Sequence, residues 1–598
     1  MFPWRCRRPS GSRTGSLRLV WQGLICGALV AYGVTLLVAA SSGARTSARA
    51  PQPRGTAAHL TCETSAVAAA VKIVGATVDS ATPLSGTFTP PGPPSPPLTG
   101  LPSICAVNLT QADSAGNPMH IVLWLPDSWN GRFQGVGGAG FLCGPLYSEL
   151  ANGVADGYAT AATDCGSSDP TGSFALNKDA SLNTALIDDF AFNGIHAMTV
   201  DGKAVTGDYY GSGARYAYFN GCSTGGREGL MEAQRFPTDY NGIVSAAPAI
   251  NWTRFIPAEI WPELVMLQSK DFLAPCKEAA FNDAVTRACG GTDGVIQDPG
   301  DCHWNPADLI GLATPCGTIT PTDAAVVEKI WAGPTSTSGK KLWYGLEPGA
   351  SFDGLAATST AADGTTSGVP FPIAVAWLGT WVQRNPNWDW HTLTYAGFDQ
   401  LFVQSQAEFS STIATDDPDL SQFRDRGGKI IIWHGLADQL IFPQGTINYY
   451  QRVQAAMGGP RRTGTFARLF LAPGAQHCAS AAGPAPGTPY QYPAPTMPLP
   501  DVVNWVEHGQ APLSILAQKV DPQTNVVTES RILCAYPLTA VYSGAGNPNI
   551  STSYRCSVAD DRVFDRPSGT RRPGSGAHGL PAGWLRLWGP RTPSSRGA

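Results

Sequence analysis

The chain has 598 residues, of which 43% are hydrophobic and 14% are charged, and its formal net charge is -5. This much apolar material can form a large buried core, so the composition excludes an intrinsically disordered chain. The 40 Lys and Arg residues are outnumbered by 45 Asp and Glu residues and are scattered along the sequence, so we expect no nucleic-acid partner.

The N-terminal region has the pattern of an export signal. Basic residues, among them Arg7 and Arg8, precede an apolar run over 23–40, and small residues follow through Ala50. We therefore expect residues 1–50 to be a signal peptide and linker, and the protein to be secreted. Because the apolar run could also span a bilayer, an uncleaved membrane anchor is the alternative.

Cysteine usage agrees with an oxidising compartment. Two of the 14 cysteines, Cys6 and Cys26, fall in the predicted signal, which leaves an even number of 12. An even set in an exported protein predicts disulfides. A zinc site is disfavoured because the sequence has no CxxC pair and no Cys/His cluster of suitable spacing.

Strand-like and helical patterns alternate over residues 60–252. A glycine-rich segment over 132–140 follows the first strand-like run, and helical spacing extends over 185–205. The alternation predicts a mostly parallel sheet with helices on both faces, which is an α/β architecture. The strand-like runs are 120–126, 158–163 and 215–219.

The pattern changes after Trp252. Residues 253–420 are rich in turn residues, tryptophans and cysteines, and we interpret them as an inserted lid domain. Residues 421–556 return to the core pattern, with a helix expected over 501–517, whereas the Arg-, Pro-, Gly- and Ser-rich tail over 557–598 is predicted to be disordered. The strand-like runs of this second core part are 429–433 and 467–471.

A candidate nucleophile lies directly after a predicted strand. Residues 221–225 read Gly-Cys-Ser-Thr-Gly, which matches the G-x-S-x-G pattern, and a helical run follows over 227–235. A sharp strand-to-helix turn strains the backbone of Ser223 and exposes its Oγ, as a nucleophile requires. A glycine-rich turn without a catalytic role is the alternative.

The serine needs a base, because its hydroxyl is a poor nucleophile until a base accepts the proton. In α/β-hydrolases the acid and then the histidine follow the serine in the chain. Asp438 and His477 each lie in a loop after a predicted strand, so we predict that Ser223, Asp438 and His477 form a catalytic triad. A turn or capping role is the alternative for Asp438, and His434, which precedes the acid, is interpreted as structural.

Each end of the predicted triad has a cysteine neighbour. Cys222 precedes Ser223, and Cys478 follows His477. If Ser223 and His477 meet in space, the two cysteines are close enough for a disulfide that ties the nucleophile to the base. A pair of free thiols is the alternative.

Longer segments around these residues resemble the tannase and feruloyl esterase family, which also includes mono(2-hydroxyethyl) terephthalate hydrolase. The resemblance extends over roughly residues 60–556 and implies an α/β-hydrolase core with an inserted lid. It also implies hydrolysis of small aromatic-acid esters, such as galloyl or feruloyl esters, without a required cofactor. The segments that carry it are 221–237, 242–244, 247–252, 433–438, 473–478 and 505–509.

The resemblance also implies site features. It implies an oxyanion hole, for which we choose the backbone N–H groups of Thr224 and Gly138, and a disulfide between Cys222 and Cys478. The pairs predicted for the other cysteines are Cys62–Cys105, Cys143–Cys165, Cys276–Cys316, Cys289–Cys302 and Cys534–Cys556.

The chain departs from the family in its predicted calcium loop. The family has three spaced aspartates there, whereas the shorter segment 289–296 has only Asp293 and the Val295 carbonyl at ligand positions. Calcium favours six to eight oxygen ligands. A structural turn is therefore the preferred interpretation, and a lid calcium ion bound by Asp293 and Val295 is the alternative.

Several alternatives concern the residues that contact the substrate and the class of protein. Aromatic side chains of the predicted lid either form its core or line the substrate pocket, and Arg384 either meets a substrate carboxylate or phenol or is solvated. The rival outside the enzymes is a non-catalytic extracellular binding protein on a hydrolase scaffold. The aromatic residues are Trp377, Trp381, Trp388 and Trp390.

Overall fold

The computed structural model describes residues 59–92, 96–291, 294–478, 493–495, 498–521, 524 and 526–558. The predicted signal and linker over 1–50, and the predicted tail from residue 559 onward, lie outside the described residues. Among the helices of the described ranges, none is long and apolar enough to cross a membrane.

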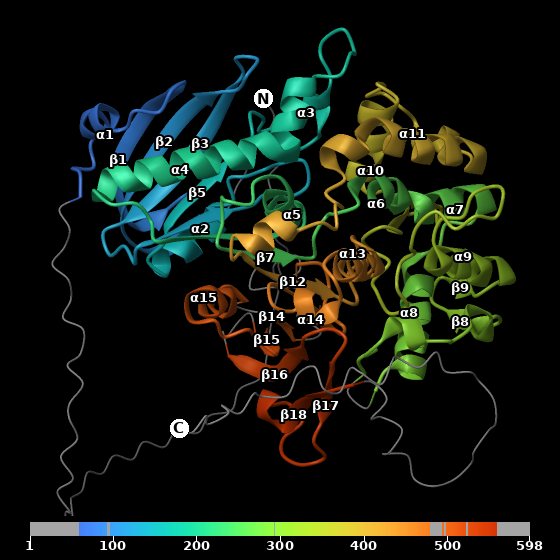
Figure 1. Ribbon diagram of the computed structural model, residues 1–598. Helices are drawn as coiled ribbons and strands as arrows, with labels where there is room; N and C mark the ends of the chain where they lie inside the picture. The colour runs from blue at the N-terminus through green and yellow to red at the C-terminus, as the bar shows by residue number, and fades with distance from the viewer. Residues whose placement is uncertain are drawn as a thin grey trace, which may run out of the picture. The chain divides into compact units, whose positions relative to one another are not determined.

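A nine-stranded mixed sheet forms the centre of the described chain (Figure 1). The strands from β5 to β13 run parallel, whereas β1, β2 and β3 pair antiparallel at one edge. The connections at that edge are too short for a crossover, so neighbouring strands must reverse direction. The predicted α/β fold with a mostly parallel sheet is confirmed. In sheet order the strands are β1 (Ala76–Phe88), β2 (Leu98–Ala112), β3 (Pro118–Pro126), β5 (Ala159–Thr163), β4 (Arg132–Val136), β6 (Tyr216–Cys222), β7 (Gly242–Ala246), β12 (Lys429–Gly435) and β13 (Ala467–Ala472).

Both faces of the sheet are covered, as the alternation of its side chains requires. In β12, Ile430 and Ile432 pack into one hydrophobic cluster, whereas Ile431 and Trp433 pack into another on the opposite face. Helices lie against each face (Figure 1). The first face carries α1 (Thr64–Ala70), α4 (Gly194–Tyr210), α5 (Thr224–Arg235) and α13 (Pro443–Ala456), and the second carries α2 (Tyr147–Ala155) and α15 (Pro498–His508).

The helix predicted over 501–517 is wrong in its second half. Helix α15 ends at His508, and Gly509 follows with a positive φ of 69°. A glycine in this conformation ends a helix, and Pro512 prevents its continuation. The chain then enters a small sheet of β14 (Ala494–Pro495), β15 (Ser514–Val520) and β16 (Val527–Cys534), which is followed by the pair β17 (Thr539–Tyr542) and β18 (Tyr554–Ser557).

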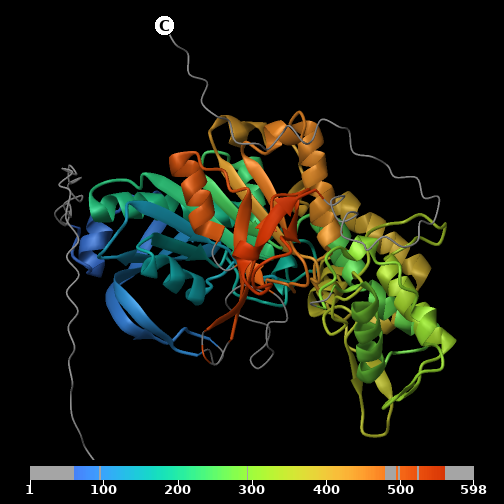
Figure 2. The ribbon, with the colours of Figure 1, turned by 90° about the horizontal axis from the view of Figure 1, so that it is seen from below.

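Residues 247–428 form one long insertion between neighbouring strands. β7 and β12 pair directly in the sheet, although this segment separates them in the chain. We call residues 247–428 the inserted segment. Its helices α7 to α9 lie away from β1 and β2 in both views (Figures 1 and 2). It contains α6 (Trp252–Glu259), α7 (Trp261–Ser269), α8 (Pro275–Cys289), α9 (Pro321–Ala332), α10 (Pro372–Ala376), α11 (Tyr395–Ile413), α12 (Ser421–Asp425) and the strand pairs β8 (Ala313–Thr314) with β9 (Gly317–Thr318) and β10 (Thr358–Thr360) with β11 (Thr366–Gly368).

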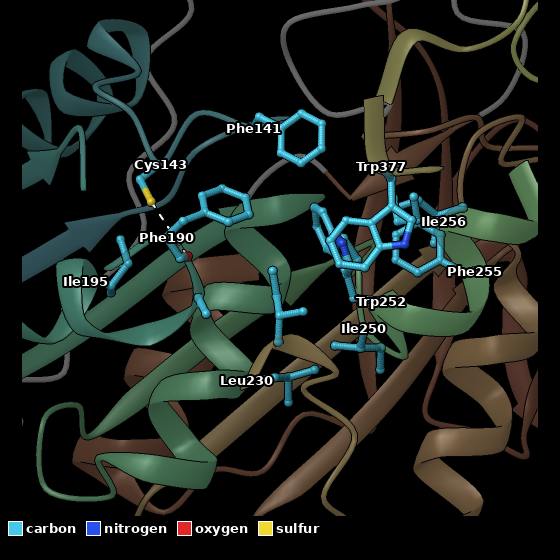
Figure 3. Close-up of a cluster of buried hydrophobic side chains, with 14 of the residues drawn as sticks. Phe141, Cys143, Phe190, Ile195, Leu230, Ile250, Trp252, Phe255, Ile256 and Trp377 are labelled. Carbon is cyan, nitrogen blue, oxygen red and sulfur yellow. Dashed lines mark hydrogen bonds between the residues drawn. The ribbon is translucent and has the colours of Figure 1, made fainter. Parts of the chain in front are cut away.

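An aromatic cluster joins the inserted segment to the core (Figure 3). Trp377 and Trp252 pack with Phe141, which directly follows the glycine-rich segment 132–140, in one buried cluster. Trp381 is fully buried in the same cluster, and its indole N–H donates to the carbonyl of Gly172 at 3.0 Å. Trp377 and Trp381 are therefore packing residues of the interior. A buried indole is stable here because its polar group has a partner.

The remaining candidate side chains of the inserted segment have separate positions. Trp390 is buried and Trp388 is half-buried. Arg384 forms an ion pair with Glu408, and its guanidinium lies over the ring of Phe409.

Six disulfides are present in the described residues. They join the same cysteines that the sequence analysis paired, and each closes a loop in a chain rich in turns. The pairs are Cys62–Cys105, Cys143–Cys165, Cys222–Cys478, Cys276–Cys316, Cys289–Cys302 and Cys534–Cys556.

Several carboxyl groups of the inserted segment are buried. Burial raises the pKa of Glu263 to about 8, that of Glu278 to about 8 and that of Glu347 to about 7. The cause is desolvation, which disfavours the charged form. Their reference value is 4.5, so the folded chain holds these protons at a pH where the unfolded chain releases them.

We predict that the protein is more stable at mildly acidic pH than at mildly alkaline pH. The stabilisation from a raised pKa is complete below the unfolded value and is lost as the pH rises through the folded value. The melting temperature should therefore fall by several degrees between about pH 5 and about pH 8. Calorimetry of the wild type and of Glu263→Gln, which cannot ionise, tests this. A melting temperature that rises over this range, or an equally steep fall in the variant, would contradict it.

Candidate active site

Ser223 lies at a sharp turn between β6 and α5. β6 ends at Cys222, and α5 begins at Thr224. Ser223 has φ 63° and ψ −122°, a conformation that is strained for a residue with a side chain. Three backbone hydrogen bonds hold it. Its N–H donates to the carbonyl of Ala246 at 3.0 Å, and its carbonyl accepts from the N–H groups of Arg227 and Ala249, each at 3.0 Å. This is the strand-turn-helix arrangement expected of a nucleophile elbow.

Glycines permit the close approach that this turn needs. A Cβ on Gly221 would lie 2.5 Å from the carbonyl carbon of Gly225. A Cβ on Gly137, in the glycine-rich loop after β4, would lie 2.4 Å from the Cα of Gly225. The loop and the turn therefore touch backbone to backbone.

Asp438 lies in the loop after β12 and is fully buried. Its Oδ2 lies 2.8 Å from Nδ1 of His477, and its Oδ1 accepts from the N–H groups of Leu440 and Ile441, each at 2.9 Å. Burial alone would raise the pKa of this carboxyl. The opposing effect of the two histidines His477 and His434 is larger in sum and holds the pKa of Asp438 well below its usual range.

His434 also contacts Asp438, a contact that the sequence analysis did not foresee. Its Nε2 lies 3.0 Å from Oδ2 of Asp438 and 3.1 Å from the carbonyl of Ile441, and its Nδ1 lies 2.9 Å from Oγ1 of Thr446. Since both partners of Nε2 are acceptors, that nitrogen carries the proton and donates it. His434 is thus a second donor to the oxygen that meets His477, and its i, i+4 spacing from Asp438 is the sequence signal.

The loop that carries His477 is fixed to the loop that carries Asp438. The backbone N–H of His477 donates to Oε1 of Gln439 at 3.1 Å, and the N–H of Ala437 donates to the carbonyl of Ala475 at 3.0 Å. A Cβ on Gly435 would lie 2.3 Å from that same carbonyl, so the glycine allows the two loops to pack closely.

The Cys222–Cys478 disulfide connects the serine turn to the histidine loop. It spans a sequence separation of 256 residues with a Cα–Cα distance of 6.0 Å. Ser223 and His477 are the direct neighbours of these cysteines, so the bond limits how far the two side chains can separate. The structure thus brings Asp438 and His477 into contact and fastens the Ser223 turn beside them.

The two predicted oxyanion donors have different environments. Thr224 is the first residue of α5, where a backbone N–H has no acceptor within its own helix, and its Oγ1 donates to the carbonyl of Gly140 at 2.7 Å. The N–H of Gly138 donates instead to Oε2 of Glu228 at 3.0 Å. The choice of Gly138 is therefore wrong, because a buried carboxyl group already accepts its hydrogen bond.

Arg227 and Glu228 form a buried pair behind the glycine-rich loop, which sequence reasoning missed. The guanidinium of Arg227 lies 5.0 Å from the ring centroid of Phe190 and 5.5 Å from that of Trp252. Burial lowers the pKa of Arg227 to about 10 and raises that of Glu228 to about 8. Glu228 acts on the site by fixing the loop that faces Ser223.

Only one of the two ligands of the calcium alternative falls within the described residues. Asp293 lies outside them, and the carbonyl of Val295 accepts a hydrogen bond from the N–H of Gly291 at 3.0 Å. The Cys289–Cys302 disulfide closes this loop.

The sequence of the chain matches a known protein family and is similar to known members of it. The family described as tannase and feruloyl esterase matches residues 105–557. A probable feruloyl esterase of Arthroderma benhamiae is 41% identical over 482 residues, which cover 78% of this chain and 88% of that protein.

Solved structures are also similar. The tannin acyl hydrolase of Aspergillus niger has a TM-score of 0.74 and 25% identity, with 84% of this chain and 96% of that chain covered. Feruloyl esterase B of Aspergillus oryzae has a TM-score of 0.70 and 28% identity, with 82% and 98% covered.

We predict that His434 positions Asp438 for turnover. Removing a hydrogen bond to a charged group costs about 1.5–3 kcal/mol, so His434→Ala should lower kcat for a p-nitrophenyl ester by on the order of tenfold or more. KM should change little, because His434 is buried behind the acid. His434→Gln keeps an N–H donor and should recover part of the rate. Equal losses in both variants, or a loss confined to KM, would contradict this role.

Proposed function

The chain belongs to the tannase and feruloyl esterase family and is a carboxylic ester hydrolase, and we propose that it is a secreted serine esterase acting on esters of aromatic acids. Ser223, His477 and Asp438 serve as nucleophile, base and acid in this proposal. The observation that carries it is the 2.8 Å contact between Asp438 and His477 beside a disulfide that ties the histidine loop to the serine turn.

The proposed first step is acylation. Nε2 of His477 accepts the Ser223 proton while Oγ forms a bond to the ester carbonyl carbon. The tetrahedral intermediate then breaks its bond to the alcohol oxygen, which receives the proton from His477. Asp438 stays ionised throughout, holds the imidazole orientation and stabilises the imidazolium.

The proposed second step is deacylation. His477 accepts a proton from water, and the resulting hydroxide adds to the acyl carbon. The bond to Ser223 Oγ breaks, the serine recovers its proton, and the aromatic acid is released.

For the oxyanion hole we propose the N–H groups of Thr224 and Gly140. In the glycine-rich loop, the N–H of Gly137 donates to Asn220, that of Gly138 to Glu228 and that of Ala139 to Leu142. Gly140 is the next residue, and its carbonyl already accepts from the Thr224 hydroxyl. One such donor typically contributes about 3 kcal/mol to stabilising the transition state.

The inserted segment is proposed to act as a lid. A Cβ on Gly140 would lie 3.2 Å from Cδ1 of Ile373, so α10 of this segment packs directly against the proposed oxyanion loop. Side chains near Ile373 would then contact the acyl group. The similarity to proteins known as feruloyl esterases and a tannin acyl hydrolase supports an aromatic acyl group, and the six disulfides of the described residues support export to an oxidising compartment.

We predict that Ser223→Ala abolishes hydrolysis of a small ester panel. The panel contains methyl ferulate, methyl gallate, mono(2-hydroxyethyl) terephthalate and a p-nitrophenyl acyl ester. Loss of the nucleophile should lower kcat by roughly 10,000-fold or more, whereas Ser338→Ala, at an exposed serine, should retain full activity. The preferred ester identifies the acyl group.

Two outcomes would contradict the proposal. Turnover that survives in Ser223→Ala would exclude this serine as the nucleophile. A folded wild-type protein that hydrolyses the p-nitrophenyl ester but neither aromatic methyl ester would overturn the aromatic-acid assignment.

A further inference from the structure

A second cluster of titratable side chains lies at the opposite end of α5 from Ser223. Helix α5 has 12 residues, so its ends are about 18 Å apart. Glu232 lies in its last turn, Asp239 lies in the loop that leads to β7, and His196 lies in the first turn of α4. The cluster is therefore separate from the site proposed for ester hydrolysis.

The three side chains converge on one point. Nδ1 of His196 lies 2.6 Å from Oδ2 of Asp239, and one ligand atom from each of His196, Glu232 and Asp239 lies within 4.8 Å of the others. The imidazole stacks on the ring of Phe236 with a centroid distance of 3.9 Å and an interplanar angle of 7°. This stacking fixes the plane in which the ring nitrogens lie.

Glu232 is the member whose position needs an explanation. Its side chain is 1% exposed, and within the described residues neither carboxylate oxygen has a hydrogen-bond donor. Burial and the neighbouring charge of Asp239 both raise the pKa of Glu232. Two adjacent carboxylates are stable in the interior when they share a proton or when a cation lies between them.

The charges around the cluster favour a cation. The carboxylates of Glu232 and Asp239 lie in the cluster, and Glu228, one turn earlier on α5, and Asp201, on α4, add negative charge nearby. One ammonium faces it, from Lys203, which donates to the backbone carbonyl of Asp239 rather than to a carboxylate. Acidic side chains therefore outnumber the ammonium group around this point.

We propose that His196, Glu232 and Asp239 bind a divalent transition-metal ion of the zinc type. Zinc takes imidazole nitrogen at about 2.0–2.1 Å and carboxylate oxygen at about 2.0–2.2 Å, with water as the fourth ligand of a tetrahedral site. Calcium and magnesium prefer all-oxygen sites, so the imidazole selects against them.

The three side chains must move slightly to hold the ion. Tetrahedral ligand atoms at these distances lie about 3.4 Å apart, so the His196–Asp239 hydrogen bond opens slightly and Glu232 moves in. The side chain of His196 is 36% exposed, which gives the ion a path from solvent.

A bound ion would connect three pieces of the core. It would join α4, the end of α5 and the loop before β7. Since α5 starts next to Ser223, the ion would stabilise the helix behind the nucleophile without touching substrate. The expected consequence is a gain in stability, with an unchanged rate at temperatures where both forms are folded.

Zinc binding by the full chain tests the proposal. Protein stripped with EDTA is dialysed against ZnCl₂ and analysed for metal, and its melting is followed with and without zinc. We expect one zinc ion per chain and a rise of several degrees in melting temperature. His196→Ala should lose both effects. Because the His196 side chain is partly exposed, the variant should still fold. Glu232→Gln, which keeps the side-chain shape, should also lose both.

His391→Ala is the matched control. His391 pairs with Asp389 at 2.7 Å on the surface of the inserted segment, so it tests for zinc held by an ordinary exposed His–Asp pair. It should retain both effects. No stoichiometric zinc in the wild type, or zinc that persists in His196→Ala and is lost in His391→Ala, would overturn the proposal and leave a shared proton as the explanation.

Discussion

The candidate site depends on the Cys222–Cys478 disulfide, which connects two loops at the ends of strands that are not neighbours in the sheet. The serine turn follows β6 and the histidine loop follows β13, and β7 and β12 lie between these strands. At about 4.8 Å per strand, the two strand ends are about 14 Å apart, which is too far for a hydrogen bond between their side chains. The histidine loop must therefore run back along the edge of the sheet, past the loop that carries Asp438. The Cys222–Cys478 disulfide and the hydrogen bonds between the acid and histidine loops hold it in that position.

Buried charge is the second constraint, because each charged or polar group at the site needs a partner to be tolerated. Asp438 stays ionised in the interior because two histidines and two backbone N–H groups surround it. Glu228 stays inside because it accepts from Gly138 and lies beside Arg227. These partners come from β12, from α5 and from loops at the ends of strands, which the sheet brings together, so the electrostatics of the site follow from the fold.

The sequence predicted the central parallel strands well, because a buried parallel strand has a local apolar pattern. It also predicted the candidate residues in the loops that follow these strands. Ser223, Asp438 and His477 were located in this way, and the family resemblance extended the prediction to the fold. The failures concern directions that no local pattern encodes. The choice of Gly138 failed because the sequence does not say where one N–H points, and the packing role of Trp381 depended on a contact with Gly172, which is distant in the chain. The contact of His434 with Asp438 spans only four residues, but the sequence alone does not show where the imidazole nitrogen points.

A fluorophosphonate probe tests whether Ser223 is the activated nucleophile. The probe reacts with a serine whose proton a neighbouring base accepts, and mass spectrometry of the digested protein locates the adduct. We expect one adduct per chain, on the tryptic peptide 216–227 that contains Ser223, and no adduct in a His477→Ala variant. An adduct on another residue, or an active protein that takes up no probe, would contradict it.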